Sequence, residues 1–260
     1  MCNITRAGQN LYIKQNIIYY MAISYSQYAK YYDSRMGEPI KKVELINLWI
    51  KKYNPKATSV LEIACGTGAI LKLMEKKYTV SGLDFSLEML DIAKKKIKKG
   101  NFYHKDMANF SLNKKFDVVL CIFDAINHLI NIRDWDKTFK NASIHLNPKG
   151  LFIFDMNTLA KWDRFEKTNN ESVEYVNKNI LINQIQRLNK SKIVFSKKIL
   201  EHETNSLYKL FEENIYEVAF EKEKVIKLLE KYFEVITIID TNRKKPSKNS
   251  ERLYFVCKLR

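Results

Sequence analysis

The chain has 260 residues, 46% of them hydrophobic and 12% aromatic, and its 45 basic residues outnumber 29 acidic ones, which gives a net charge of +16. This length and apolar content predict a folded domain with a sizeable core and exclude a largely disordered chain. The charge favours anionic partners, but the lysine pairs recur on expected helices without interleaved aromatic residues. Composition alone therefore does not define a nucleic-acid-binding protein.

The cysteines form no close pairs, so we expect neither a metal site nor a disulfide framework, and a reducing cytoplasm suits them. They are Cys2, Cys65, Cys121 and Cys257. The apolar stretch "IIYYMAIS" is too short to span a bilayer and lacks a small-x-small cleavage site, so we expect neither membrane insertion nor export. Residues 1–20 are expected to be an N-terminal extension.

Residues 21–56 predict an N-terminal helical cap. Helical periodicity runs through a tyrosine cluster, "YSQYAKYYD", and then through a second apolar helix, "VELINLWIKKY".

From residue 57 to residue 157, short apolar runs alternate with amphipathic helices. The runs lack the polar alternation of half-buried strands, which favours a parallel sheet covered on both faces. Residues 158–220 break this rhythm with four β-rich runs, typical of an antiparallel insertion, and residues 221–260 return to a helix and two strands. The sequence therefore predicts an α/β, doubly wound, seven-stranded, mostly parallel, Rossmann-like sheet with a β insertion after the fifth strand.

The stretch "VLEIACGTGA", residues 60–69, places a glycine turn directly after the first expected strand. A dinucleotide site would prefer a third glycine where Leu71 stands, and Glu62 would add negative charge beside the phosphates. An adenosine with an amino-acid tail suits the turn better, because its ammonium favours nearby acceptors and Gly66 and Gly68 let the backbone approach. That ligand is S-adenosylmethionine.

Carboxylates at the next two strand ends agree with this ligand. Asp84 lies 18 residues after Gly66, where it can accept hydrogen bonds from both ribose hydroxyls, although an N-cap role is the alternative and Ser86 could fill it. Asp106 could accept from the adenine amino group while the Met107 backbone donates to the ring.

On these residues the sequence resembles the class I S-adenosylmethionine-dependent methyltransferases, through "LEIACGTG", "GLDFSLEML", "HKDMANFSL", "FDVVLCIFDAINHL" and "LNPKGLFIFD". The segments "SYSQYAKYYD" and "EENIYEVAFEKEKVIKLLEKYFEV" are further similar to the N,N-dimethyltransferases of nucleotide-linked amino sugars. The sequence departs from that group at "EPIKKVEL" and "DMNTLAKWDRF", and both departures bear on the acceptor rather than on the cofactor.

The resemblance implies that Tyr25 and His128 lie beside the methyl acceptor as the catalytic residues. S-Adenosylhomocysteine would be the product. The residues expected around the cofactor are Tyr32, Glu62, Ala64, Gly66, Gly68, Asp84, Phe85, Asp106, Met107 and Ile122.

Methyl transfer from a sulfonium is an in-line displacement that needs alignment and dryness. A neutral amine needs only its lone pair, whereas a hydroxyl needs a base, for which His128 is the candidate. The basic loop "TNRKKPSKNSE" should emerge on the cofactor side, so Arg243, Lys244 or Arg252 is expected to meet a phosphate on a small, sugar-linked or phosphorylated acceptor.

Several alternatives stay open. The acceptor atom can be nitrogen or oxygen, and the protein a monomer or a homodimer. A tRNA or rRNA methyltransferase is a second reading, although "FDAINHL" stands where an Asp/Asn-Pro-Pro-aromatic run would mark a base-amine enzyme. A third is a protein that binds S-adenosylmethionine without turnover.

Overall fold

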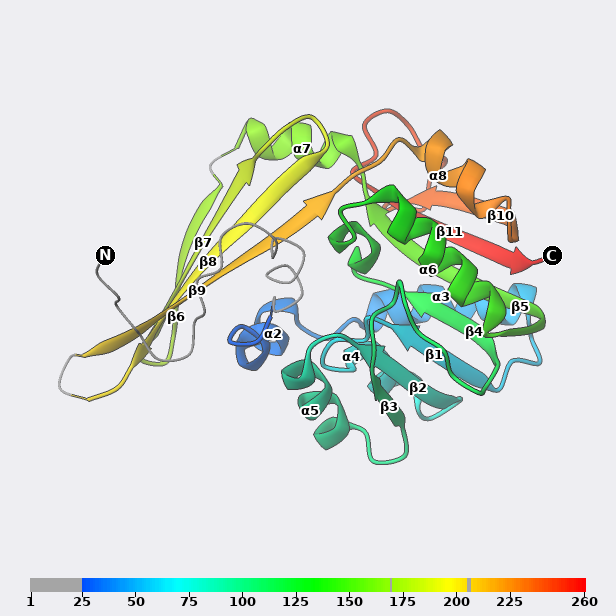
Figure 1. The fold of residues 1–260 in the computed structure, drawn as a ribbon, viewed down its shortest axis with the longest axis horizontal. Coiled ribbons are helices and arrows are strands. Elements are labelled where there is room, and N and C mark those ends of the chain that lie inside the picture. The colour runs from blue at the N-terminus through cyan, green and yellow to red at the C-terminus, as the bar shows by residue number, and fades with distance from the viewer. Residues whose placement is uncertain (1–24, 169, 205–206) are drawn as a thin grey trace, which may run out of the picture.

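The computed structural model describes residues 25–168, 170–204 and 207–260 (Figure 1). The expected extension, residues 1–20, and the part of the cap before Tyr25 lie outside the described residues. Within the described ranges, no helix is both long and apolar enough to cross a membrane.

The core is one seven-stranded sheet in the order β10-β11-β5-β4-β1-β2-β3. Neighbouring strands are parallel except around β11, which runs antiparallel to both β10 and β5. The expected seven-stranded, mostly parallel sheet is confirmed. Its strands are β1 (Ser59–Ile63), β2 (Thr79–Asp84), β3 (Asn101–His104), β4 (Phe116–Cys121), β5 (Leu146–Asn157), β10 (Phe233–Asp240) and β11 (Arg252–Leu259).

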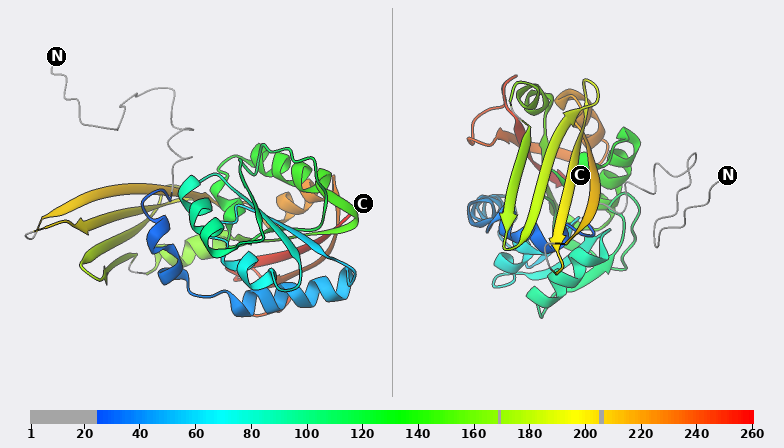
Figure 2. Two further views of the ribbon diagram at one scale, coloured as in Figure 1. Left: turned by 90° about the horizontal axis from the view of Figure 1, so that it is seen from below. Right: turned by 90° about the vertical axis from the view of Figure 1, so that its left-hand side faces the viewer.

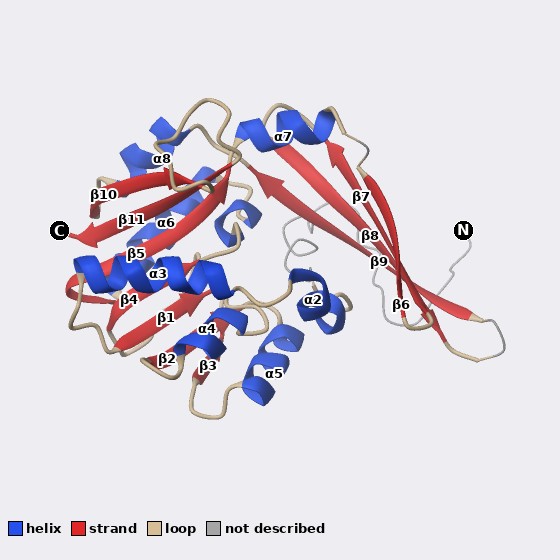
Figure 3. Cartoon of the chain, turned by 180° about the vertical axis from the view of Figure 1, so that it is seen from behind, coloured by secondary structure: helices blue, strands red, loops and turns tan. Residues whose placement is uncertain are grey.

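Helices cover both faces of this sheet, as Figure 3 shows from behind. The side chains of β5 alternate between the two faces, because successive residues of a strand point in opposite directions. Phe152 and Phe154 join the cluster under α6 (Ile132–Ile144) and α8 (Lys222–Leu229). Leu151 and Ile153 join the cluster under the opposite helices, which are α3 (Ile40–Tyr53), α4 (Ala69–Met74) and α5 (Leu87–Lys96).

A four-stranded antiparallel sheet projects from the core between β5 and α8, and we call it the arm (Figure 2). Its four strands confirm the expected antiparallel β insertion. The strands, in sheet order, are β6 (Glu171–Val176), β7 (Asn179–Arg187), β8 (Lys192–His202) and β9 (Tyr208–Val218).

The insertion begins with a helix, α7 (Leu159–Glu166), ahead of the four β-rich runs. Its residues Leu159, Trp162 and Phe165 follow one another at helical spacing and share one face. That face packs on Ile193 of β8, with Trp162 fully buried.

Helix α2 (Ala29–Met36) lies between the arm and the core (Figure 1, Figure 3). On the arm side, Tyr28 and Tyr31 pack in a buried cluster with Leu181 of β7. On the core side, the Asp33 carboxylate accepts a hydrogen bond of 2.6 Å from the Thr67 hydroxyl in the glycine turn. Helix α2 is therefore held to the arm on one side and to the glycine turn of the core on the other.

Leu71 stands where a dinucleotide site would carry its third glycine, and a glycine on the neighbouring strand makes room for it. Leu71 is fully buried, and a Cβ atom added to Gly82 of β2 would lie 2.9 Å from its Cδ1 and 2.7 Å from the Cys65 Sγ. Gly82 thus makes the space that Leu71 and the turn occupy.

We predict that Gly82→Ala lowers the free energy of unfolding by about 1–3 kcal/mol, since the added methyl overpacks a closed region. Urea denaturation measures this, with Thr79→Ala at the exposed start of the same strand as the control. Equal stability of the two variants would contradict the packing described here.

Candidate functional site

The glycine turn leaves β1 in a conformation that ordinary side chains avoid. Ala64, Gly66 and Gly68 all have positive φ, at 56°, 53° and 73°. Left-handed backbone is easily adopted by glycine and strained elsewhere, so Ala64 carries the strain of this turn. The turn brings residues 64–68 to the carboxyl edge of the sheet, where Ala64 and Gly66 are partly exposed and Cys65 and Thr67 are buried.

Asp84 holds this turn in place. Its carboxylate accepts hydrogen bonds from the Gly66 amide at 2.7 Å and from the Ser86 amide at 2.9 Å. Burial raises the Asp84 pKa, and backbone donors, these two among them, together with the His128 charge oppose the rise. Ser86 rather than Asp84 caps α5, accepting from the Met89 amide at 3.2 Å. Each Asp84 oxygen keeps a lone pair for a further donor.

Glu62, at the end of β1, is the most isolated carboxylate of this edge. Only 2% of it is exposed, and its Oε2 atom has no hydrogen-bond partner among the described residues. Burial, together with the charges of Asp84 and Asp155, raises its pKa well above the ordinary value. A buried acceptor without a donor is costly, so it favours a ligand that supplies one.

The other residues expected around the cofactor surround the ends of β2, β3 and β4. Asp106 forms a tight turn, accepting from the Ala108 amide at 2.8 Å, and Met107 is buried. Phe85 is 45% exposed, and Ile122 is buried in the cluster under α3, α4 and α5.

Tyr25, Tyr32 and His128 come together although they are far apart in the sequence. The Tyr25 hydroxyl lies 3.4 Å from His128 Nε2, and the Tyr25 and Tyr32 ring centroids are 5.8 Å apart. Burial raises the Tyr25 pKa, so the phenol keeps its proton. Burial also lowers the His128 pKa, against the charge of Asp124, and so favours the neutral ring.

A group of buried ion pairs that the sequence did not reveal lies beside His128. Arg252 contacts Asp155 at 2.6 Å and Asp124 at 2.7 Å, and Lys42 contacts Asp155 at 3.1 Å. Although burial raises the Asp124 pKa, Arg252 and neighbouring cations lower it to about 2. Arg252 was expected to meet an acceptor phosphate. The structure engages its guanidinium with two carboxylates, and its contact with a phosphate stays a prediction.

Glu217 of β9 extends this group onto the arm. The Asn157 amide donates to Glu217 at 3.0 Å and also to Asp124, and Lys161 of α7 donates to the Asn157 side-chain oxygen at 3.0 Å. Burial and the nearby Asp124 charge raise the Glu217 pKa to about 8. One signal in the sequence could have revealed it: Glu217 occupies the same alternating face of β9 as buried Ile215.

The basic loop leaves β10 at the same edge of the sheet. Arg243 and Lys244 are exposed, and the Lys244 amide donates to Asp240 at 2.9 Å within the loop. The loop is held against the start of α7, where the Thr158 hydroxyl donates to the Ser250 carbonyl at 2.6 Å.

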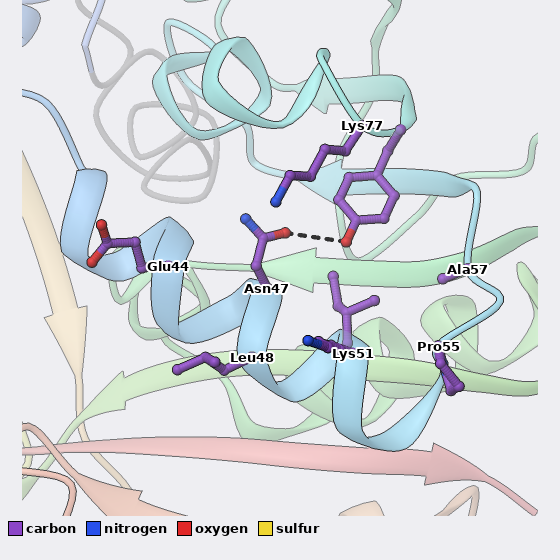
Figure 4. Close-up of a pocket in the computed structure, with 9 residues that line it drawn as sticks. Glu44, Asn47, Leu48, Lys51, Pro55, Ala57 and Lys77 are labelled. Carbon is purple, nitrogen blue, oxygen red and sulfur yellow. Dashed lines mark hydrogen bonds between the residues drawn. The ribbon is translucent and has the colours of Figure 1, made fainter.

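The groove in Figure 4 lies elsewhere, over α3 and the end of α4. It is an open hollow of about 580 Å³ lined by residues such as Asn47 and Tyr78, which bond to each other at 3.1 Å. It contains none of the expected site residues. In the described part of the chain, no three His, Cys, Asp or Glu side chains are grouped for a metal.

The arrangement of strands and the edge that carries the carboxylates define the class I methyltransferase fold. Residues 60–150 match the family described as "Methyltransferase domain". A S-adenosylmethionine-dependent methyltransferase from Clostridium acetobutylicum has a similar structure, with a TM-score of 0.79 and 27% identity over 90% of this chain and 98% of that one. The sugar N-methyltransferase KedS8 from Streptoalloteichus sp. shares the fold, with a TM-score of 0.76 and 18% identity over the full length of both chains.

Among curated relatives, the dTDP-3-amino-3,6-dideoxy-alpha-D-glucopyranose N,N-dimethyltransferase of Streptomyces fradiae is 35% identical over 41% of this chain and 42% of that protein. The putative methyltransferase YqeM of Bacillus subtilis is 32% identical over 53% of this chain and 57% of that protein. The chain thus spans about half the length of these relatives. Together the matches confirm the resemblance to class I S-adenosylmethionine-dependent methyltransferases, including the amino-sugar group.

We predict that Arg252→Met lowers the free energy of unfolding by about 3–5 kcal/mol, because it removes the ion-pair partner of Asp124 and leaves buried Asp155 with Lys42 alone. Arg243→Met, an exposed change in the preceding loop, should alter it by less than about 0.5 kcal/mol. Chemical denaturation of both variants measures the difference, and a stable Arg252→Met protein would contradict the ion pairs described here.

Glu217 should also make the free energy of unfolding depend on pH. A carboxyl whose folded pKa is raised binds its proton more tightly when folded, so its contribution is greatest below the unfolded pKa of 4.5 and declines as the pH rises towards about 8. We expect Glu217→Gln to remove this decline from the free energy of unfolding, measured between those pH values. Glu203→Gln, an exposed change near the arm tip, should keep the wild-type curve. Parallel curves for wild type and Glu217→Gln would show that the Glu217 pKa is not raised.

Proposed function

We propose that this protein transfers the methyl group of S-adenosylmethionine to a nitrogen of a small, sugar-linked metabolite. The observation that carries the proposal is an imbalance of charge along the site. Asp124 and Asp155 are paired with cations, whereas Glu62 and Asp84 have no ion pair among the described residues. A site with uncompensated carboxylates in a chain of net charge +16 favours a cationic ligand over an anionic one.

The residues at the ends of β1, β2 and β3 fit the cofactor. Glu62 would accept from its ammonium group and Asp84 from its ribose hydroxyls. Asp106 and the Met107 backbone would hold the adenine, and exposed Phe85 would cover one of its faces. The cofactor, when bound, supplies the methyl group on a sulfonium leaving group.

Tyr25 and His128 are proposed to hold the acceptor. The protonated Tyr25 phenol can donate to, or accept from, an acceptor amine, and the neutral His128 ring can take the proton that the amine must lose. Asp124, whose pKa is lowered to about 2, lies close enough to contribute to the raised pKa of Tyr25, so an amine that arrives as an ammonium ion meets this carboxylate here.

Nitrogen is favoured over oxygen by that same negative charge, since a hydroxyl gains little from it. The names of the relatives agree, because dTDP-linked amino-sugar N,N-dimethyltransferases recur among them. For a phosphate-bearing acceptor, Arg243 and Lys244 are proposed as partners, since they are among the exposed cations of the basic loop. Arg252 stays a predicted partner as well, with its guanidinium in contact with two carboxylates.

The proposal is tested with the acceptor dTDP-3-amino-3,6-dideoxyglucose and its 3-hydroxy counterpart, with mass spectrometry of the products. We expect methylation of the amine and none of the hydroxyl. Methylation of the hydroxyl alone would overturn the choice of nitrogen. Binding of S-adenosylmethionine with no transfer to either compound, or to a panel of amines, would favour a non-catalytic binding protein.

His128→Gln separates the two chemistries further. With an amine acceptor we expect kcat to fall at neutral pH and to recover above the pKa of the amine, because a neutral amine needs no base. An oxygen acceptor would lose about 10²–10⁴-fold in rate, without such recovery. His202→Gln on the arm is the matched control and should behave as wild type.

A further inference from the structure

Tyr25 is held in an unusual backbone conformation. Its φ angle is 79°, in the left-handed region that is costly for residues other than glycine. The chain then turns over residues 25–28 into α2, and the Ala29 amide donates to the Tyr25 carbonyl at 3.0 Å. A costly backbone conformation persists only where surrounding groups determine it, so this turn needs partners outside itself.

Glu213 of β9, on the arm, is such a partner. One of its carboxylate oxygens, Oε1, accepts a hydrogen bond from the Gln27 amide at 2.6 Å and another from the Ser26 hydroxyl at 3.2 Å. Amides at the start of a helix lack acceptors within the helix, and a carboxylate is a favourable acceptor there. Both donors belong to the turn, so Glu213 ties the turn to the arm.

The surroundings of Glu213 strengthen this tie. Only 8% of Glu213 is exposed, and a hydrogen bond shielded from water is stronger than one in water. Lys197 stands opposite Glu213 on β8, and burial lowers the Lys197 pKa to about 8, against the charge of Glu213. The Lys197 Nζ atom also lies 3.9 Å from the centroid of the Tyr28 ring. The arm therefore holds the turn through a carboxylate and the tyrosine that ends it through a lysine.

The turn in its place carries the Tyr25 side chain to the candidate site. The Tyr25 hydroxyl lies 3.4 Å from His128 Nε2, and the centroids of the two rings are 5.7 Å apart. His128 belongs to the core, at the end of the short 3-10 helix after β4, whereas Glu213 belongs to the arm. The position of the phenol beside the imidazole thus depends on a contact between the turn and the arm.

We propose that Glu213 is a positioning residue for methyl transfer, because its hydrogen bonds to the turn set the orientation of Tyr25 towards the acceptor. This inference rests on the proposed role of Tyr25 in holding the acceptor. Methyl transfer depends on alignment, and a misplacement of about 1 Å can lower a rate by about 100-fold. A loosened turn should therefore lower kcat, while the carboxylates at the ends of β1 and β2 still bind the cofactor.

Methylation of dTDP-3-amino-3,6-dideoxyglucose by Glu213 variants tests this inference. Glu213→Ala should lower kcat by about 100-fold and keep the wild-type affinity for S-adenosylhomocysteine. Glu213→Gln should recover about tenfold of that loss, because its amide oxygen still accepts from the Gln27 amide in a weaker, uncharged hydrogen bond. Glu212→Ala is the matched control and should keep the wild-type kcat, since Glu212 is exposed and points to the opposite face of the same strand.

A signal from Tyr25 itself separates this inference from the proposed function. A fluorotyrosine placed at position 25 of the full chain reports the surroundings of that ring by fluorine NMR. Glu213→Ala should shift this signal, whereas Glu212→Ala should leave it in place. If circular dichroism shows that Glu213→Ala does not fold, Glu213→Asp replaces it, because the shorter side chain withdraws the oxygen from the Gln27 amide.

An unchanged fluorine signal in the folded variant would overturn the inference. So would a wild-type kcat in that variant, or a Glu213→Gln protein that is no faster than Glu213→Ala. A wild type that methylates no amine would instead refute the proposed function, and the fluorine signal would then decide by itself whether Glu213 positions Tyr25.

Discussion

The carboxyl edge of the parallel sheet concentrates negative charge, and the fold compensates only part of it. Asp155 at the end of β5 and Asp124 after β4 share Arg252, and Lys42 reaches Asp155 from α3. On the other side of β4, Asp84 holds the glycine turn, and neither Asp84 nor Glu62 has an ion pair among the described residues. The chain thus keeps its stabilising ion pairs on one half of the edge and leaves the other half poised for a positively charged ligand.

The backbone that follows β4 helps to position the ion-paired half of this edge. Phe123 and Asp124 both have positive φ, at 62° and 52°, directly after β4. Such a conformation is costly for non-glycine residues, and the Asp124 contacts with Arg252 and Asn157 oppose that cost. The bend starts the short 3-10 helix of residues 125–128 and so places His128 under Tyr25. The strained backbone and the ion pairs that oppose its cost thus together position the candidate base, His128.

The sheet and the glycine turn could be predicted from the sequence because they depend on local patterns. A glycine turn after an apolar run and acidic residues at strand ends can be found without knowing which segments meet. The ion pairs could not be found in this way. Lys42, Asp155 and Arg252 are more than 90 residues apart from one another, and only the register of β11 on β5 brings two of them together. The sequence shows that a strand follows the basic loop, but it does not show that Arg252 at the start of that strand meets two carboxylates.

Local sequence patterns also predict only part of the arm. Its strands were evident from their β-rich composition, but α7 was hidden because a single amphipathic face of eight residues is a weak signal. Glu217 shared no motif with His128, although the fold sets both around Tyr25. The burial of the N-terminal tyrosines could not be predicted without the arm, since α2 packs on the arm as well as on the glycine turn.

The most direct test of this account is isothermal titration of S-adenosylhomocysteine into the wild-type protein and into Glu62→Gln. The account predicts a single site in the wild type, and an affinity in the variant that is weaker by about 1.5–3 kcal/mol, the usual contribution of a hydrogen bond to a charged group. Absence of binding to well-folded wild-type protein would contradict it, and so would equal affinity in the two proteins.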